Sequence, residues 1–190
     1  MGFSRAELEE YVGTGVPDLV GPDLRLLFVG INPGLWTAAT QTHFAHPGNR
    51  FYPALLRAGV VTREIDRGVG MTADDRQHLV GRRIGITNIV NRATARAAEL
   101  DADELRAGAA DLRRFVRRHR PAVVAITGIT AYRTAFERPR AVTGEQDEPL
   151  EGARLWVVPN PSGLNAHENV ETLAAAYRAP AIAAGVIVRT

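Results

Sequence analysis

Leu26–Leu35 (LLFVGINPGL) is the stretch of sequence that decides the fold. Its first four residues form a continuous apolar run, which is typical of a parallel strand covered on both faces. The turn that follows, Gly30–Gly34, ends the strand abruptly, because its glycines permit close backbone approach or positive φ and Pro33 removes an amide donor. Ligands of open α/β sheets bind beyond the carboxyl ends of strands, where this turn lies. A glycine-rich turn is equally consistent with a plain connection, so other residues must decide its role.

The composition predicts one domain and excludes several kinds of chemistry. A chain of 190 residues with 45% hydrophobic residues is long enough for one proper core. No apolar run approaches the length of a membrane span, and no basic segment followed by an apolar stretch opens the chain, so a cytoplasmic location without membrane contact is expected. The absence of cysteine excludes disulfides, thiolate zinc sites, cysteine nucleophiles and cysteine-held iron–sulfur clusters.

The basic residues are all arginine. The formal charge is only +2, but all 23 basic residues are arginine and the sequence contains no lysine. Arginine binds phosphate through a bidentate fork and suits nucleic acid, although a compositional bias could equally have spread arginine over an ordinary surface. Without lysine, no side-chain amine can form a Schiff base.

Strand and helix patterns alternate along the chain, which predicts an α/β fold. We expect a three-layer α/β/α sandwich whose central, mainly parallel sheet has four strands, with residues 1–23 as an N-terminal helix and loop, 24–178 as the core and 179–190 as a C-terminal tail. Residues 37–48 are expected to be a long connection, and residues 139–152 a loop or small hairpin. The strands are expected at 25–31, 83–89, 122–127 and 155–158, and the helices at 4–12, 50–58, 72–81, 101–120, 129–136 and 168–178.

Three asparagines follow three of the predicted strands. Asn32, Asn88 and Asn160 each lie at a carboxyl end, and parallel strands bring these ends to one edge of the sheet. A carboxamide offers a donor and an acceptor side by side, which complements an amide-like ligand such as the N3–H and O4 edge of uracil. No carboxylate or cysteine cluster accompanies them, so no metal is expected. Asparagine also caps helices and fills turns, an interpretation that suits any one of them better than all three together.

Two of these asparagines belong to motifs with a family resemblance. Gly30–Gly34 (GINPG) and Asn160–Leu164 (NPSGL) resemble the two signature motifs of the mismatch-specific uracil/thymine DNA glycosylase family, within the uracil-DNA glycosylase superfamily. Phe44–Phe51 (FAHPGNRF) resembles the family's segment between the motifs, and Thr87-Asn88 falls in family order. The resemblance covers roughly residues 24–178. It implies a monofunctional glycosylase of base excision repair that leaves an abasic site, acts as a monomer on double-stranded DNA with a damaged or mismatched base, and needs no cofactor.

The resemblance also implies residue roles. Asn32 would orient the attacking water and Asn160 would support catalysis near the developing charge on the base carbonyl. Phe44 would stack on the flipped base and Asn88 would read its edge, within a pocket that includes Gly30, Ile31 and Gly34. A core phenylalanine is the alternative for Phe44.

The second motif would enter the DNA. Leu164 would be the wedge that fills the space of the flipped nucleotide, held by the turn at Pro161–Gly163. Ser162, Gly163 and Asn165 would also bind the DNA. The alternative is a leucine that packs under its own loop. Arg50 and Arg92 follow strand ends and are expected to contact phosphates.

Several departures leave the substrate open. The first motif has no carboxylate, so general-base catalysis by Asn32 is excluded and slow turnover is expected. Ala166, Asn91 and Trp36 differ from the family pattern. Ala166 leaves mismatch selectivity open, and Thr37, near the 5-position of the base, leaves thymine acceptance open. Ethenocytosine and hypoxanthine remain alternative substrates, and a non-catalytic lesion-binding protein or a small-nucleotide binder remains an alternative function.

Overall fold

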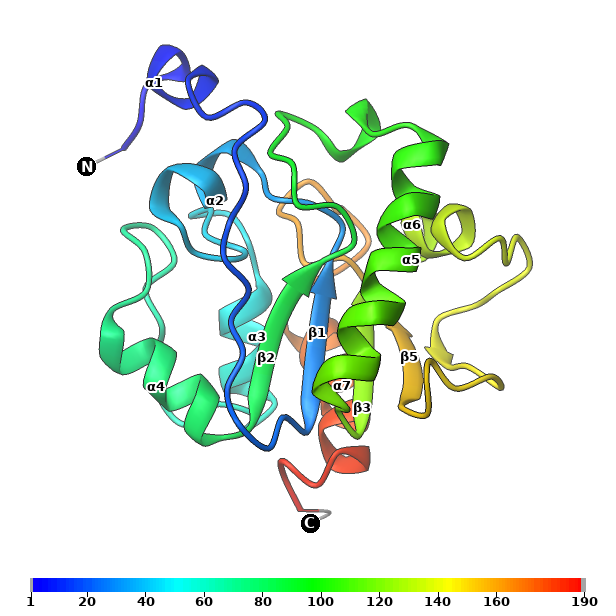
Figure 1. Ribbon diagram of the computed structural model, residues 1–190. Helices are drawn as coiled ribbons and strands as arrows, with labels where there is room; N and C mark the ends of the chain where they lie inside the picture. The colour runs from blue at the N-terminus through cyan, green and yellow to red at the C-terminus, as the bar shows by residue number, and fades with distance from the viewer. Residues whose placement is uncertain (1, 189–190) are drawn as a thin grey trace.

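The predicted apolar strand lies inside a five-stranded sheet. In the computed structural model, β1 (Leu26–Gly30) is buried along its whole length and pairs in parallel with both β2 (Ile84–Asn88) and β3 (Val123–Thr127). Next to β3 lies β5 (Arg154–Val158), also parallel, and the strand order is β2-β1-β3-β5-β4. Figure 1 shows the central strands side by side, with their carboxyl ends at the top of the view.

The expectation of four strands was wrong by one. A two-residue strand, β4 (Gly144–Glu145), pairs antiparallel with Trp156 and Val157 of β5 at the sheet edge. It lies within the stretch that was expected to be a loop or small hairpin. The Nε atom of Arg154 lies 2.6 Å from a carboxylate oxygen of Glu145 across this pair. Two residues are too few to show a period-two pattern, so the sequence carried no strand signal here.

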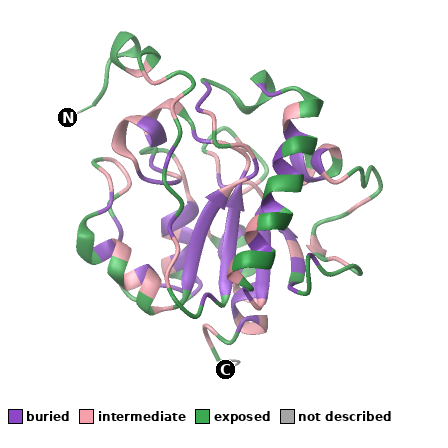
Figure 2. Ribbon diagram, viewed as in Figure 1, coloured by how far each residue is buried: buried purple, intermediate pink, exposed green. Residues whose placement is uncertain are grey.

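Helices cover both faces of the sheet. On one face, α3 (Phe51–Arg57), α4 (Ala73–Gly81) and α7 (Val170–Ala183) cover side chains such as Phe28 and Ile86. The other face carries α5 (Ala102–His119) and α6 (Ile129–Ala135). Figure 2 shows the sheet buried between these layers, so the α/β/α sandwich is confirmed.

The helix boundaries follow their capping residues. Ser4, Thr72 and Asp101 each form a capping box, with Glu7, Asp75 and Glu104 respectively, and these boxes start α1 (Arg5–Glu9), α4 and α5. The first helix ends before the expected Val12, and α7 runs past Arg178 through Pro180. Packing explains this extension, because Tyr177 and Ala181 are fully buried against the sheet.

Two short helices were not predicted. α2 (Leu35–Thr40) lies largely in the expected long connection, and a single 3₁₀ turn, η1, spans Ala97–Glu99. Leu35 and Ala38 of α2 pack against Val16 and Ala93. These partners are distant in sequence, so α2 depends on tertiary contacts that a local pattern does not show.

The structure describes residues 2–188, so Met1 and residues 189–190 of the expected C-terminal tail lie outside it. Within the described residues, the segment before β1 is packed rather than loose: Leu19 forms an antiparallel bridge with Ile86, and Val16 is buried. No helix of this part of the chain is long and apolar enough to cross a membrane.

Candidate functional site

The loops that follow β1, β2, β3 and β5 lie at one edge of the sheet. Asn32, Asn88 and Asn160 all lie at this edge, which we call the asparagine edge. Gly30 of β1 is in register with Asn88 of β2, which places Asn32 just beyond Asn88. Gly128 follows β3 with φ of +113°, and a Cβ there would lie 3.2 Å from Ile31 Cδ1 and 3.8 Å from Asn160 Cβ. The turns after β1 and β5 therefore meet over a glycine, whose role the sequence pattern did not reveal.

The Asn32 carboxamide has a fixed orientation. Its Nδ2 donates to the carbonyl oxygen of Arg92 at 2.8 Å and to Thr94 Oγ1 at 2.7 Å. The Thr94 hydroxyl donates in turn to the Arg96 carbonyl oxygen at 2.8 Å, so it acts as an acceptor toward Asn32. Both Nδ2 protons are thus used, and Oδ1 has no partner among residues 2–188, so it can accept from an outside donor such as water.

Asn88 packs directly on Gly30. A Cβ on Gly30 would lie 2.4 Å from Asn88 Oδ1 and 3.3 Å from Phe44 Cζ, so no larger residue fits at this position without displacing one of them. The Asn88 oxygen and the tip of the Phe44 ring therefore lie side by side. By contrast, the space that a Cβ of Gly34 would take is open.

Phe44 is held in an unusual conformation. Its φ is +57°, a left-handed value that bulky residues rarely adopt. One ring face stacks on Phe51 with centroids 4.0 Å apart and an interplanar angle of 25°. The residue is only partly buried, unlike the fully buried Phe51. Strained backbone of this kind persists where the surroundings fix it, and it often occurs at functional sites.

The turn after β5 is organised by its own side chains. Asn160 Oδ1 accepts from the Ser162 amide at 2.9 Å, and Asn165 Nδ2 donates to the Asn160 carbonyl oxygen at 3.1 Å. A Cβ on Gly163 would lie 2.6 Å from the carbonyl oxygen of Gly48, so this turn packs backbone to backbone against residues 46–50. Leu164 projects from the turn with 92% of its surface exposed, so it does not pack under its own loop.

The two arginines expected at phosphates have protein partners. The Arg50 guanidinium donates to the carbonyl oxygens of Glu168 at 2.8 Å, Asn165 at 3.0 Å and Gly163 at 3.3 Å. Arg92 forms a bidentate pair with Glu104 at 2.7 and 2.9 Å, which raises the pKa of Arg92 and lowers that of the carboxyl. Contact of either arginine with DNA stays a prediction.

Arg50 should therefore stabilise the turn that carries Leu164. We expect Arg50→Met to speed backbone hydrogen exchange at residues 161–168 and to lower the free energy of unfolding by about 1–3 kcal/mol, because three carbonyls lose a charged donor. The matched control is Arg57→Met, which removes only the exposed pair with Glu171 and should cost at most about 1 kcal/mol. Equal exchange at residues 161–168 in wild type and Arg50→Met would contradict the bracing role.

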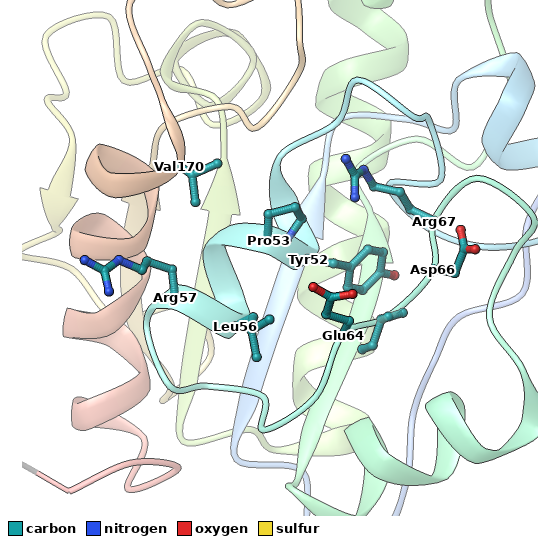
Figure 3. Close-up of a pocket in the computed structure, with 9 residues that line it drawn as sticks. Tyr52, Pro53, Leu56, Arg57, Glu64, Asp66, Arg67 and Val170 are labelled. Carbon is teal, nitrogen blue, oxygen red and sulfur yellow. The ribbon is translucent and has the colours of Figure 1, made fainter.

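A separate hollow lies beside α3. Its volume is about 580 Å³, and Figure 3 shows Tyr52, Pro53 and Leu56 lining it together with Glu64, Arg67 and Val170. None of these residues belongs to the asparagine edge. Within residues 2–188, no group of three or more histidine, aspartate or glutamate side chains could hold a metal ion.

The comparisons with known proteins agree with this fold. The family model of the uracil DNA glycosylase superfamily matches residues 17–180. A solution NMR structure from Methanosarcina acetivorans, described as a candidate uracil DNA glycosylase, has a similar fold with a TM-score of 0.60 at 17% identity. The match covers 88% of this chain and 98% of that chain. Since the family model spans most of the chain, the protein belongs to the uracil DNA glycosylase superfamily.

Proposed function

We propose that the protein is a monofunctional DNA glycosylase of base excision repair. It takes uracil out of DNA, with G·U mismatches as the favoured context, and hydrolyses the N-glycosidic bond to leave an abasic site. The observation that carries the proposal is the Asn32 carboxamide, whose Nδ2 is fixed by Arg92 and Thr94 so that Oδ1 remains for a water. Hydrolysis of an N-glycosidic bond needs water as the nucleophile, and this acceptor can orient one.

The base pocket would be formed by Phe44 and Asn88. One face of Phe44 is covered by Phe51, so the opposite face is the one that can stack on a flipped base. Base–aromatic stacking contributes about 1–3 kcal/mol. The Asn88 oxygen lies beside this ring over Gly30, where it can accept the N3–H of uracil.

Cleavage would depend on stabilising the leaving base. Asn32 can hold a water but cannot take its proton, so the bond would break through an oxocarbenium-like sugar and water would be captured afterwards. Asn160 could assist, because its Oδ1 is bonded to the Ser162 amide and its Nδ2 has no partner within residues 2–188. That amide donor suits the negative charge that develops on a base carbonyl. Turnover would be slow. Because the chain has no lysine, no side-chain imine can form with the abasic sugar, so the strand would not be cut by that route.

A base-release assay tests the proposal. Purified protein in excess is incubated with duplexes that carry uracil, thymine, hypoxanthine or ethenocytosine, each opposite several partners. We expect the highest release of uracil opposite guanine, and alkali-labile abasic sites rather than direct breaks. Binding to a G·U duplex without release of any base would favour the non-catalytic lesion-binding alternative, and release of hypoxanthine alone would favour another deaminated base.

A further inference from the structure

His43 is a buried histidine whose two ring nitrogens both have partners. Its side chain lies in the loop that leads into Phe44, and the residue is 1% exposed. Nε2 lies 3.0 Å from the carbonyl oxygen of Pro17, and Nδ1 lies 3.2 Å from Nδ2 of Asn88. The Tyr52 hydroxyl, on α3, donates to the His43 carbonyl oxygen at 2.7 Å and fixes the backbone as well.

These contacts determine where the ring proton is. A carbonyl oxygen can only accept, so Nε2 must carry the proton that bonds Pro17. In the neutral ring Nδ1 is then an acceptor, and the atom of Asn88 that faces it must be the amide nitrogen. The Pro17 carbonyl oxygen thus sets the tautomer of His43, and this tautomer sets the orientation of the Asn88 carboxamide.

The surroundings oppose the reversed orientation of Asn88. A rotation of its amide by 180° would direct Oδ1 at the Nδ1 lone pair of His43, which is a repulsive contact. On the other side, Oδ1 lies against Gly30, where there is no Cβ to displace it. One Nδ2 proton bonds His43, and within the described part of the chain the other proton and Oδ1 have no hydrogen-bond partner, so both can contact a ligand.

We propose that His43 is the positioning residue that makes this site discriminate uracil from cytosine. The inference rests on the proposed function, with Asn88 as the residue that reads the base edge. In the fixed orientation, Asn88 accepts from N3–H and donates to O4 of uracil. Cytosine presents an acceptor at N3 and an amino donor at C4, so it matches only the reversed amide, which His43 disfavours.

Burial favours the neutral form of His43. Burial lowers its pKa, and the positive charge of Arg76 on α4 lowers it further. The Pro17 carbonyl and the charge of Asp18, both on the segment before β1, act in the opposite direction, but burial is the largest cause. Protonation on acidification would turn Nδ1 into a donor and remove the acceptor that orients Asn88.

Two variants separate positioning from structure. His43→Phe keeps a ring but removes the acceptor, whereas His43→Asn can place Oδ1 close to the Nδ1 position and restore it. Single-turnover release of uracil and of cytosine is measured from oligonucleotides in which the base lies opposite an abasic spacer, so that pairing does not bias the comparison. A bidentate match is worth about 1–3 kcal/mol, so the uracil-to-cytosine ratio should fall about five- to 150-fold in His43→Phe. In His43→Asn it should stay within about threefold.

The pH profile gives an independent readout. Because burial lowers the pKa of His43, we expect uracil release by wild type to fall only when the pH drops below the usual range of histidine and the ring gains a proton. This fall should be weaker in His43→Asn, which has no titrating ring. An unchanged ratio in folded His43→Phe would overturn the proposal. If His43→Phe fails to fold, the pH profile decides: an equal decrease of uracil release at low pH in wild type and His43→Asn would overturn the proposal.

The failure of the proposed function would look different. In that case wild type would release no uracil from any substrate. The role of His43 would then be measured by equilibrium binding, as the relative affinity for uracil- and cytosine-containing oligonucleotides. An affinity ratio that is equal in wild type and His43→Phe would overturn the positioning role on its own.

Discussion

Replacing Asn32 with alanine should abolish base release while sparing DNA binding. The substitution removes the Oδ1 acceptor that orients the water, and the Arg92 carbonyl oxygen and the Thr94 hydroxyl lose the amide donor of Asn32. A misplaced nucleophile costs about a hundredfold or more in rate. We expect single-turnover release of uracil to fall by at least that factor, with the dissociation constant for a G·U duplex within about threefold of wild type.

Asn32→Asp is the sharper companion variant. A carboxylate could in principle act as a general base, which contributes about 10²–10⁴-fold. Here, however, one carboxylate oxygen would replace Nδ2 and face the Arg92 carbonyl oxygen, where the structure has an amide donor 2.8 Å away. We therefore expect Asn32→Asp to be slower than wild type at neutral pH. A large gain in rate would show that the amide contact to Arg92 is not retained during the reaction.

The sequence predicted the strands at the centre of the sheet well. The apolar run of β1 is buried as expected, and the capping boxes at Ser4, Thr72 and Asp101 start their helices. These features are local, so residue type and spacing are enough to define them. The convergence of Asn32, Asn88 and Asn160 on one edge was also predictable, because it follows from the parallel arrangement of strands.

The features that sequence missed depend on contacts between distant segments. β4 and α2 are too short to show a period, and they form through partners such as Trp156 and Val16. Arg50 could be placed near the site but its three carbonyl partners could not be foreseen, because they lie more than 110 residues further along the chain. The role of His43 likewise depends on Pro17 and Asn88, which only the fold brings to its two nitrogens.

Replacing Leu164 with alanine should impair activity on duplex DNA much more than on single strands. Leu164 is 92% exposed, so its side chain stabilises nothing in the free protein, and the melting temperature should not change. In a duplex, an apolar wedge would offset the few kcal/mol needed to unstack and extrude a nucleotide. A single strand has no pairing to break and needs no wedge. We expect release from a G·U duplex to fall at least about tenfold while release from single-stranded uracil changes by less than about threefold.

The control for this prediction is another exposed aliphatic side chain. Val188 is 77% exposed and follows α7, where the Ala184 carbonyl oxygen accepts from Arg25 just before β1, so it lies at the opposite end of the sheet from the three asparagines, and Val188→Ala should leave both rates unchanged. Arg50→Met should share the duplex-selective loss, because Arg50 bonds the carbonyl of Gly163 next to Leu164. The double variant should then lose less than the sum of the two single losses, since both act through one loop. Equal losses on duplex and single strand in Leu164→Ala would instead place Leu164 in base binding and remove its role as a wedge.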